Sequence, residues 1–291
     1  MDKRLYRIGH TEMEICKPEQ MLSPKNLELF RVETQGGNKI VYHMEFTDDI
    51  IALEASLREK QDLSCREVKR DNLRVFQSGR GECRVINFKG AEKPYAITWQ
   101  EEERFIRVWY DREVASMLVY DTVFIAALCM EKFLIKDGAM ILHSAYMLRD
   151  GEAILFSAPS ETGKSTQADL WEKYRGTRTV NGDRSLLIRE PEGWYAYGFP
   201  VCGSSEICHN EAYPVRAIVM LKQAKKNQVY PLPGIQAVRE LMAQITVNAW
   251  DVAFQMSVID KLEQLIAEVP VYRQECDISE KAVECLEKKL K

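Results

Sequence analysis

Residues 158–166 constrain the fold of this chain more than any other segment. They are Ala158, Pro159, Ser160, Glu161, Thr162, Gly163, Lys164, Ser165 and Thr166. The segment fits the Walker A pattern, in which Ala or Gly, four variable residues, Gly, Lys and Ser or Thr follow one another. An apolar run at 153–157 precedes it and a helix-like segment at 164–174 follows it. The sequence therefore predicts a strand, a phosphate-binding loop (P-loop) and a helix.

The residue types in this loop suit a nucleoside triphosphate. Phosphates require several backbone N–H donors and the positive end of a helix. Gly163 keeps the backbone accessible, Lys164 supplies a cation to the outer phosphates, and Ser165 offers a hydroxyl to Mg²⁺. Glu161 is unusual as an anion in such a loop, so its side chain must point to solvent or toward a cation. The alternative is a strand-turn-helix connection without a ligand.

Composition limits the class of protein. The 291 residues are 46% hydrophobic and 29% charged, which is typical of a soluble globular chain. The formal charge of −4 argues against a surface that coats nucleic acid. The cysteines show no C-x-x-C pair, so we expect reduced thiols, and Cys202, Cys208 and His209 alone make a poor metal site. No signal peptide begins at Met1, so we expect a cytoplasmic protein.

The apolar stretch at 114–135 is the candidate closest to a membrane span. Asp121, Glu131 and Lys132 interrupt it, and the uninterrupted run is well short of the ~20 residues that cross a bilayer. We expect a buried amphipathic helix near 113–135 and no membrane partner.

Two regions differ in texture, and together they predict an α+β chain. Residues 5–112 alternate like half-buried strands, for example at 39–46 and 105–110, with turns at 36–38 and 78–81. We expect a β-rich N-terminal domain at 1–137 and a nucleotide-binding domain at 138–291, with a mixed sheet and flanking helices. In the second domain the pattern predicts strands at 140–148, 153–157, 178–188, 194–197, 215–221 and 269–273, and helices at 164–174, 235–245, 251–267 and 279–290. Asp150-Gly151 predicts a hairpin turn, and Ser279 an N-cap.

With its surroundings, the loop resembles the catalytic domain of the HPr kinase/phosphorylase and phosphoenolpyruvate carboxykinase-like superfamily. The resemblance rests on Ile141-Leu142-His143-Ser144-Ala145 before the loop and on Gly163-Lys164-Ser165-Thr166 within it. The segments at 200–206, 217–221 and 269–272 also look like those of small HPr-kinase-related proteins. It covers roughly residues 138–291 and does not extend to the N-terminal region.

The resemblance implies roles for further residues. It places His143 beside the active site as support for acid/base chemistry; the alternative is a half-buried strand histidine. Asn181-Gly182-Asp183-Arg184 stands where the family has two adjacent aspartates, so Gly182 removes one carboxylate and Asp183 remains as base and metal ligand. The alternative is an Asn-Gly hairpin turn. Glu206 is a candidate metal ligand or a solvated loop residue.

These features favour a kinase that transfers the γ-phosphoryl group of ATP, with Mg²⁺ held by Ser165, Asp183 and Glu206 and catalysis by His143, Asp183 and Lys164. The acceptor would be a hydroxyl on a peptide, a protein or a small molecule, and a homo-oligomer is one alternative for the quaternary state. A second hypothesis is an ATP-binding regulatory or scaffold protein with little catalytic activity, supported by Gly182 and Glu161. A carboxykinase fits less well because the chain is short for that enzyme.

Overall fold

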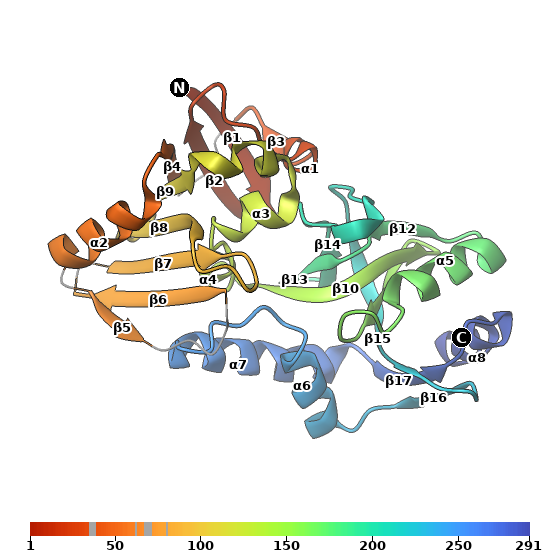
Figure 1. Cartoon of the computed structure of the whole chain (residues 1–291). Coiled ribbons are helices and arrows are strands. Elements are labelled where there is room, and N and C mark those ends of the chain that lie inside the picture. The colour runs from red at the N-terminus through yellow and green to blue at the C-terminus, as the bar shows by residue number, and fades with distance from the viewer. Residues whose placement is uncertain (35–38, 62, 67–71, 80) are drawn as a thin grey trace. The chain divides into compact units, whose positions relative to one another are not determined.

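The computed structural model describes residues 1–34, 39–61, 63–66, 72–79 and 81–291. These residues form two compact units, Met1–Met130 and Glu131–Lys291. Each unit combines a mixed sheet with helices, so the chain is α+β, as the sequence predicts (Figure 1). The division between the two units falls a few residues before the domain boundary expected between residues 137 and 138. The expected boundary concerns functional domains and stays a prediction.

The strands of the first unit form one sheet in the order β3-β1-β2-β4-β9-β8-β7-β6-β5. β4 is parallel to both of its neighbours, β2 and β9, and the other pairs are antiparallel. Its elements up to the last strand are β1 (Asp2–Ile8), β2 (Thr11–Lys17), α1 (Lys25–Glu28), β3 (Arg31–Val32), β4 (Ile40–Thr47), α2 (Ile50–Gln61), β5 (Ser64–Arg66), β6 (Leu73–Ser78), β7 (Gly81–Asn87), β8 (Pro94–Glu102) and β9 (Phe105–Asp111).

The strands expected at 39–46 and 105–110 are confirmed as β4 and β9. The turn expected at Gly36-Gly37-Asn38 lies outside the described residues. For the turn at 78–81, Ser78 pairs with Gly81 where β6 meets β7, and Arg80 lies outside the described residues.

The single helix expected near 113–135 is wrong. The segment forms a 3-10 helix, η1 (Arg112–Val119), and two short helices, α3 (Asp121–Ala126) and α4 (Glu131–Leu134). Tyr120 has extended backbone angles and Cys129 has a φ of 50°, and both interrupt helical hydrogen bonding. Carbonyls in the segment accept from tyrosine hydroxyls instead, at 2.8 Å from Tyr110 to Phe124 and 2.9 Å from Tyr42 to Leu128. The apolar spacing does not reveal these long-range partners.

The second unit has one sheet in the order β11-β10-β13-β14-β15-β17-β16. β12 also pairs with β10, and β11 also pairs with β15. β11, β15 and β17 are parallel to one another, so their carboxyl ends meet at one edge of the sheet. After α4, its elements are β10 (Ala139–Arg149), β11 (Glu152–Ser157), α5 (Lys164–Arg175), β12 (Arg178–Asn181), β13 (Arg184–Glu190), β14 (Gly193–Tyr197), η2 (Gly203–Ser205), β15 (Ala212–Gln223), β16 (Gln228–Pro231), α6 (Gly234–Met242), α7 (Val252–Glu268), β17 (Val271–Cys276) and α8 (Glu280–Leu290).

Alternating side chains on the central strands of this unit bury both faces of its sheet. In β11, Ile154 and Phe156 belong to a core with residues of α5 and α8, whereas Ala153 and Leu155 belong to a core with residues of α6 and α7. The two helix pairs therefore cover opposite faces (Figure 1). Each fully buried Leu or Phe contributes roughly 1.5–3 kcal/mol. This burial holds β11 in the sheet, and the phosphate loop follows the carboxyl end of β11.

Most expected elements of the second unit are confirmed within a few residues. Asp150 and Gly151 both have positive φ and join β10 to β11 in a tight hairpin. Asp251 caps α7, since its side chain accepts from Phe254 N at 3.0 Å. Ser279 occupies the N-cap position of α8 but makes no side-chain cap bond, and its hydroxyl donates to Asp277. β16 and η2 were not expected.

The strand expected at 178–188 is interrupted. β12 and β13 run in the same direction and pair with successive parts of β10, so Asn181-Gly182 is not a hairpin turn. Asn181 Oδ1 accepts from the backbone N–H of Asp183 at 2.9 Å and of Arg184 at 2.8 Å. The side chain thus takes N–H groups that would otherwise pair along the sheet. Asp183 lies at this interruption, immediately before β13.

None of the described helices is long and apolar enough to cross a membrane.

Candidate functional site

The expected strand, loop and helix are all present around residues 158–163. β11 ends at Ser157 and α5 begins at Lys164, with Gly163 at its N-cap position. Gly163 has a φ of 107°, which side-chain-bearing residues rarely adopt, so glycine is required there. Glu161 also has a positive φ, of 65°, and is exposed, as its charge demands. The first turn of α5 therefore presents its free N–H groups to the loop.

Lys164 is buried inside the loop, with 7% of its surface exposed. Its Nζ donates to the carbonyls of Ala158 at 3.2 Å and Pro159 at 3.4 Å. Burial lowers the pKa of this ammonium; the charge of Asp183 opposes that shift and the charge of Arg184 adds to it. The loop thus holds a cation whose charge is incompletely compensated, which favours an added anion.

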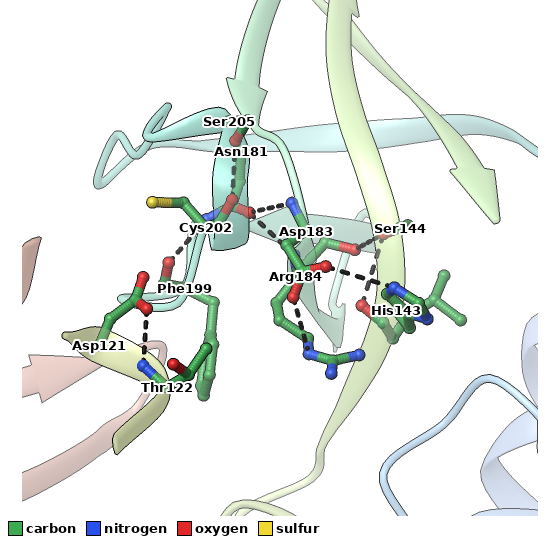
Figure 2. A network of polar contacts seen from close by, with 12 residues as sticks. Asp121, Thr122, His143, Ser144, Asn181, Asp183, Arg184, Phe199, Cys202 and Ser205 are labelled. Carbon is green, nitrogen blue, oxygen red and sulfur yellow. Dashed lines mark hydrogen bonds and ion pairs between the residues drawn. The ribbon is translucent and has the colours of Figure 1, made fainter. Parts of the chain in front are cut away.

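His143 and Asp183 meet beside the loop. His143 lies in β10, and Asp183 follows the interruption after β12. His143 Nε2 is 3.3 Å from Asp183 Oδ1, and Arg184 Nε is 3.3 Å from Asp183 Oδ2 (Figure 2). The two side chains from different strands therefore hold both oxygens of one carboxylate.

The backbone around His143 is fixed by bonds that the sequence did not reveal. Its N–H donates to Gln244 O at 2.9 Å, and its carbonyl accepts from Ser157 Oγ at 2.8 Å. Ser144 N donates to Asp183 O at 3.0 Å, which ties the two strands together next to the pair. These bonds hold the imidazole and the carboxylate in a defined relation.

Asn181 is a positioning residue that sequence reasoning missed. Besides accepting from residues 183 and 184, its Nδ2 donates to Phe199 O at 2.7 Å, and the residue is fully buried. Its amide thus fixes both the turn that carries Asp183 and the start of the segment that leads to η2. Asn side chains commonly bond the backbone two residues later and so form a turn. The sequence Asn181-Gly182-Asp183 was therefore the available indication of this role.

The electrostatics keep Asp183 ionised. Burial alone would raise the pKa of this carboxyl, but the hydrogen bond from His143 and the charges of Arg184, His143 and Lys164 outweigh it, so the pKa lies below its ordinary value. Asp183 is therefore a carboxylate throughout the neutral range.

One hollow of about 380 Å³ brings the phosphate loop and the pair together. Most of the residues expected at the site line this hollow, together with Gly182 and three residues at or next to η2. Its lining residues are His143, Ser160, Glu161, Gly163, Lys164, Ser165, Thr166, Gly182, Asp183, Cys202, Ser204 and Ser205.

Four expected site residues do not line this hollow. Ala158 is buried under the loop and Pro159 is exposed, although the carbonyls of both contact Lys164. Thr162 faces a second hollow. Glu206 is exposed just after η2, with a φ of 56°. Among the described residues, no three His, Cys, Asp or Glu side chains are grouped to hold a metal ion. Of the residues expected as metal ligands, Ser165 and Asp183 line this hollow and Glu206 does not.

The second hollow, of about 570 Å³, lies across the loop at the carboxyl ends of β15 and β17. Glu161, Gly163 and Thr166 line both hollows, so the loop separates them. The remaining lining residues are Thr162, Gln167, Gln223, Ala224, Lys225, Cys276, Asp277 and Ile278. The carboxyl edge of parallel strands is where open α/β sheets commonly bind ligands.

A steric clash with Ser205 explains why residue 182 is a glycine in this fold. A Cβ atom at this position would lie 1.9 Å from Ser205 Oγ and 2.4 Å from Ser205 Cβ. Rotation of the hydroxyl would not relieve the second contact, so η2 itself would have to move. Ser205 therefore occupies the space that a second aspartate would need.

We expect Gly182→Asp to lower the free energy of unfolding by about 1–3 kcal/mol, because it overpacks the contact with Ser205. The cost should shrink when Ser205→Gly is present, since both clashing atoms are then absent. Urea denaturation of the wild type, the two single variants and the double variant measures this coupling. An equal cost of Gly182→Asp with and without Ser205 would contradict the steric explanation.

A sequence profile described as "SynChlorMet cassette protein ScmC" matches residues 115–291, more than half of the chain. The chain belongs to the ScmC family. The matched range contains the phosphate loop, His143, Asp183 and η2.

Other comparisons add little to the ScmC assignment. A search of curated proteins found no match. Among solved structures, the chain is similar to the Hpr(Ser) kinase/phosphatase from Coxiella burnetii, with 11% sequence identity over 51% of this chain and 95% of that chain. The TM-score of 0.29 is too low for this likeness to support an argument about activity.

Proposed function

We propose that this ScmC-family chain is a Mg²⁺-dependent phosphotransferase that moves the γ-phosphoryl group of ATP to a hydroxyl acceptor. The observation that carries the proposal is the shared hollow: Lys164 of the phosphate loop and the carboxylate of Asp183, paired with His143, both line it. Phosphoryl transfer needs charge neutralisation and positioning more than covalent chemistry. A loop cation and a facing carboxylate supply those two requirements.

The residues of the hollow fit a magnesium ion. A serine hydroxyl and a carboxylate are hard oxygen ligands, and Mg²⁺ commonly takes one or two of these together with phosphate oxygens and water. Ser165 and Asp183 would hold it, and when bound it would neutralise charge on the phosphates. Glu206, exposed and outside the wall, is a less suitable third ligand.

The hollow across the loop offers space for the nucleoside. With the triphosphate on the N–H groups before α5, the base and ribose would extend past Gly163 toward Gln223 and Ile278. Ile278 is 76% exposed, so its apolar surface is available to a base. The acceptor would then approach from the opposite side, where Asp183 lies.

In the transfer step, the acceptor oxygen attacks the γ-phosphorus while the bond from that phosphorus to the bridging oxygen breaks. ADP leaves, and the hydroxyl proton passes to the carboxylate of Asp183. His143 holds Asp183 Oδ1 in place through the 3.3 Å contact. Lys164 and Arg184 stabilise negative charge on the transferred group.

A second candidate is an ATP-binding regulatory protein with little catalytic activity. The absence of a carboxylate at Gly182, enforced by Ser205, favours it. Because the two candidates differ only in chemistry, nucleotide binding alone does not distinguish them.

Two measurements test the proposal. Calorimetric titration with ATP, with and without Mg²⁺, is expected to show magnesium-dependent binding. Incubation with γ-phosphate-labelled ATP and fractionated extract is expected to label an acceptor in a protein-dependent manner. Binding without any transfer would favour the regulatory candidate, and no binding would overturn both.

A further inference from the structure

Five hydroxyl-bearing residues line the hollow that holds Asp183 and Lys164, and they differ in what their side chains do. Ser160, Ser165 and Thr166 belong to the phosphate loop and the first turn of α5, where a triphosphate would bind. Ser204 and Ser205 belong to η2, which lies against Asp183 and outside the phosphate loop. An in-line transfer needs its acceptor on the side away from the leaving group. In the proposed function the acceptor approaches from the side of Asp183, where the η2 hydroxyls lie.

The two η2 serines are not equivalent. Ser205 Oγ donates to Cys202 O at 2.7 Å and accepts from Ile207 N at 3.3 Å, so its hydroxyl closes the turn. Ser204 is exposed and takes part in no hydrogen bond within the part of the chain that the structure describes. Its hydroxyl can reorient without a structural cost.

The turn that carries Ser204 lies directly against the carboxylate. A Cβ atom at Gly203 would be 3.2 Å from both Cβ and Cγ of Asp183. Gly203 and Glu206 have φ values of 58° and 56°, and they bracket the turn. The glycine thus permits close approach of the turn to Asp183. The next residue, Ser204, lines the hollow that Asp183 and Lys164 also line.

We propose that Ser204 is a phosphoryl acceptor, so that the protein phosphorylates itself on η2 within one chain. The inference rests on the proposed function. Ser204 Oγ attacks the γ-phosphorus of bound ATP, the bond to the bridging oxygen breaks, ADP leaves, and the serine proton passes to Asp183. No further reactant is needed.

The product would act on the same site. A phosphoserine carries a charge of about −1.5 to −2 and strong acceptor oxygens. At residue 204 it would share the hollow with Lys164, the cation that the proposed function assigns to a triphosphate. Modification is therefore expected to weaken ATP binding several-fold and to limit each chain to one phosphate.

The test uses the full-length protein with Mg-ATP and intact-mass spectrometry. The wild type is expected to gain one phosphoryl group, and fragmentation should place it on Ser204. Ser204→Ala should gain none, whereas Ser257→Ala, a serine on α7 outside both hollows, should gain one. A phosphate on any other residue, or its retention in Ser204→Ala, would overturn the inference.

Mixing variants tests transfer within one chain. When wild type is incubated with a mass-distinguished Lys164→Ala chain, only the wild type should gain the phosphate. Modification of the Lys164→Ala chain would refute transfer within the chain. If the wild type binds Mg-ATP and labels an external acceptor but never itself, the inference fails and the proposed function stands. If it does not bind Mg-ATP, both fail.

Discussion

Lys164→Met is expected to weaken ATP binding by roughly 10- to 100-fold and to abolish phosphoryl transfer. Hydrogen bonds to charged groups are worth about 1.5–3 kcal/mol each, and the proposed function gives this buried ammonium the role of binding the phosphates. Methionine retains an apolar stem of similar length, so packing inside the loop is largely preserved. Calorimetric titration with Mg-ATP measures the loss.

The same change should leave the free energy of unfolding unchanged or higher. Burial lowers the pKa of Lys164 in the folded state, so between that pKa and the unfolded value stability rises with pH. Below that range the cost of burying the ammonium is fully present. Lys164→Met removes this cost along with two hydrogen bonds to carbonyls.

Lys173→Met is the matched control, because Lys173 is exposed on the same helix. It should leave both ATP affinity and stability close to wild type. If Lys164→Met bound ATP as tightly as this control does, the phosphate loop would not be the nucleotide site.

Asp183→Asn is expected to reduce the rate of phosphoryl transfer by about 10²- to 10⁴-fold, the usual contribution of a positioned general base. The amide oxygen can still accept from His143, but the amide nitrogen cannot accept from Arg184, so one of the two contacts is retained while the proton acceptor is lost. In the free protein the carboxylate is a poor base, because His143, Arg184 and Lys164 lower its pKa. The negative charge of a bound triphosphate would oppose the effect of these cations on Asp183. Single-turnover kinetics with labelled ATP measures the step.

The pH dependence of stability supplies a second reading of Asp183→Asn. A carboxyl with a lowered folded pKa stabilises the protein above its unfolded pKa of about 3.9, and this is lost as pH falls through the folded value. The variant should therefore be less stable than wild type at pH 7, and the difference should close in acid. Thermal unfolding at a series of pH values measures it.

Glu206→Gln tests whether Glu206, and not only Asp183, supplies a carboxylate that the reaction needs. Glu206 is exposed and outside the hollow, so its variant should transfer phosphate at close to the wild-type rate. A loss as large as that of Asp183→Asn would place Glu206 in the reaction and contradict the assignment of Asp183 as the main acidic residue.

Local sequence was sufficient where short-range geometry decides the structure. The strand, loop and helix around Gly163 and the hairpin at Asp150-Gly151 follow from neighbouring residues, because positive φ and helix-start patterns are local. The single helix expected near 113–135 failed where the chain is interrupted at Tyr120 and Cys129. One of the tyrosines that donate to carbonyls of this segment, Tyr42, is distant in sequence.

The contact between His143 and Asp183 could be predicted only in part from the sequence. The resemblance indicated both residues, but their 3.3 Å contact depends on how β12 and β13 pair with β10 and on where that pairing is interrupted. The contribution of Ser205 could not be predicted, because the atoms that exclude a side chain at Gly182 come from a turn about twenty residues later in the chain. Such packing is a property of the folded chain alone.

Residues 199–210 form an excursion between β14 and β15. Gly198 N donates to Glu211 O at 2.8 Å, which closes the base of the excursion, and η2 lies within it. The excursion also binds the end of β12, because His209 N donates to Val180 O at 3.0 Å and Gly182 N donates to Ile207 O at 3.3 Å. A change in its length would therefore disturb the turn that carries Asp183. The η2 turn and the residues around Asp183 would have to change together.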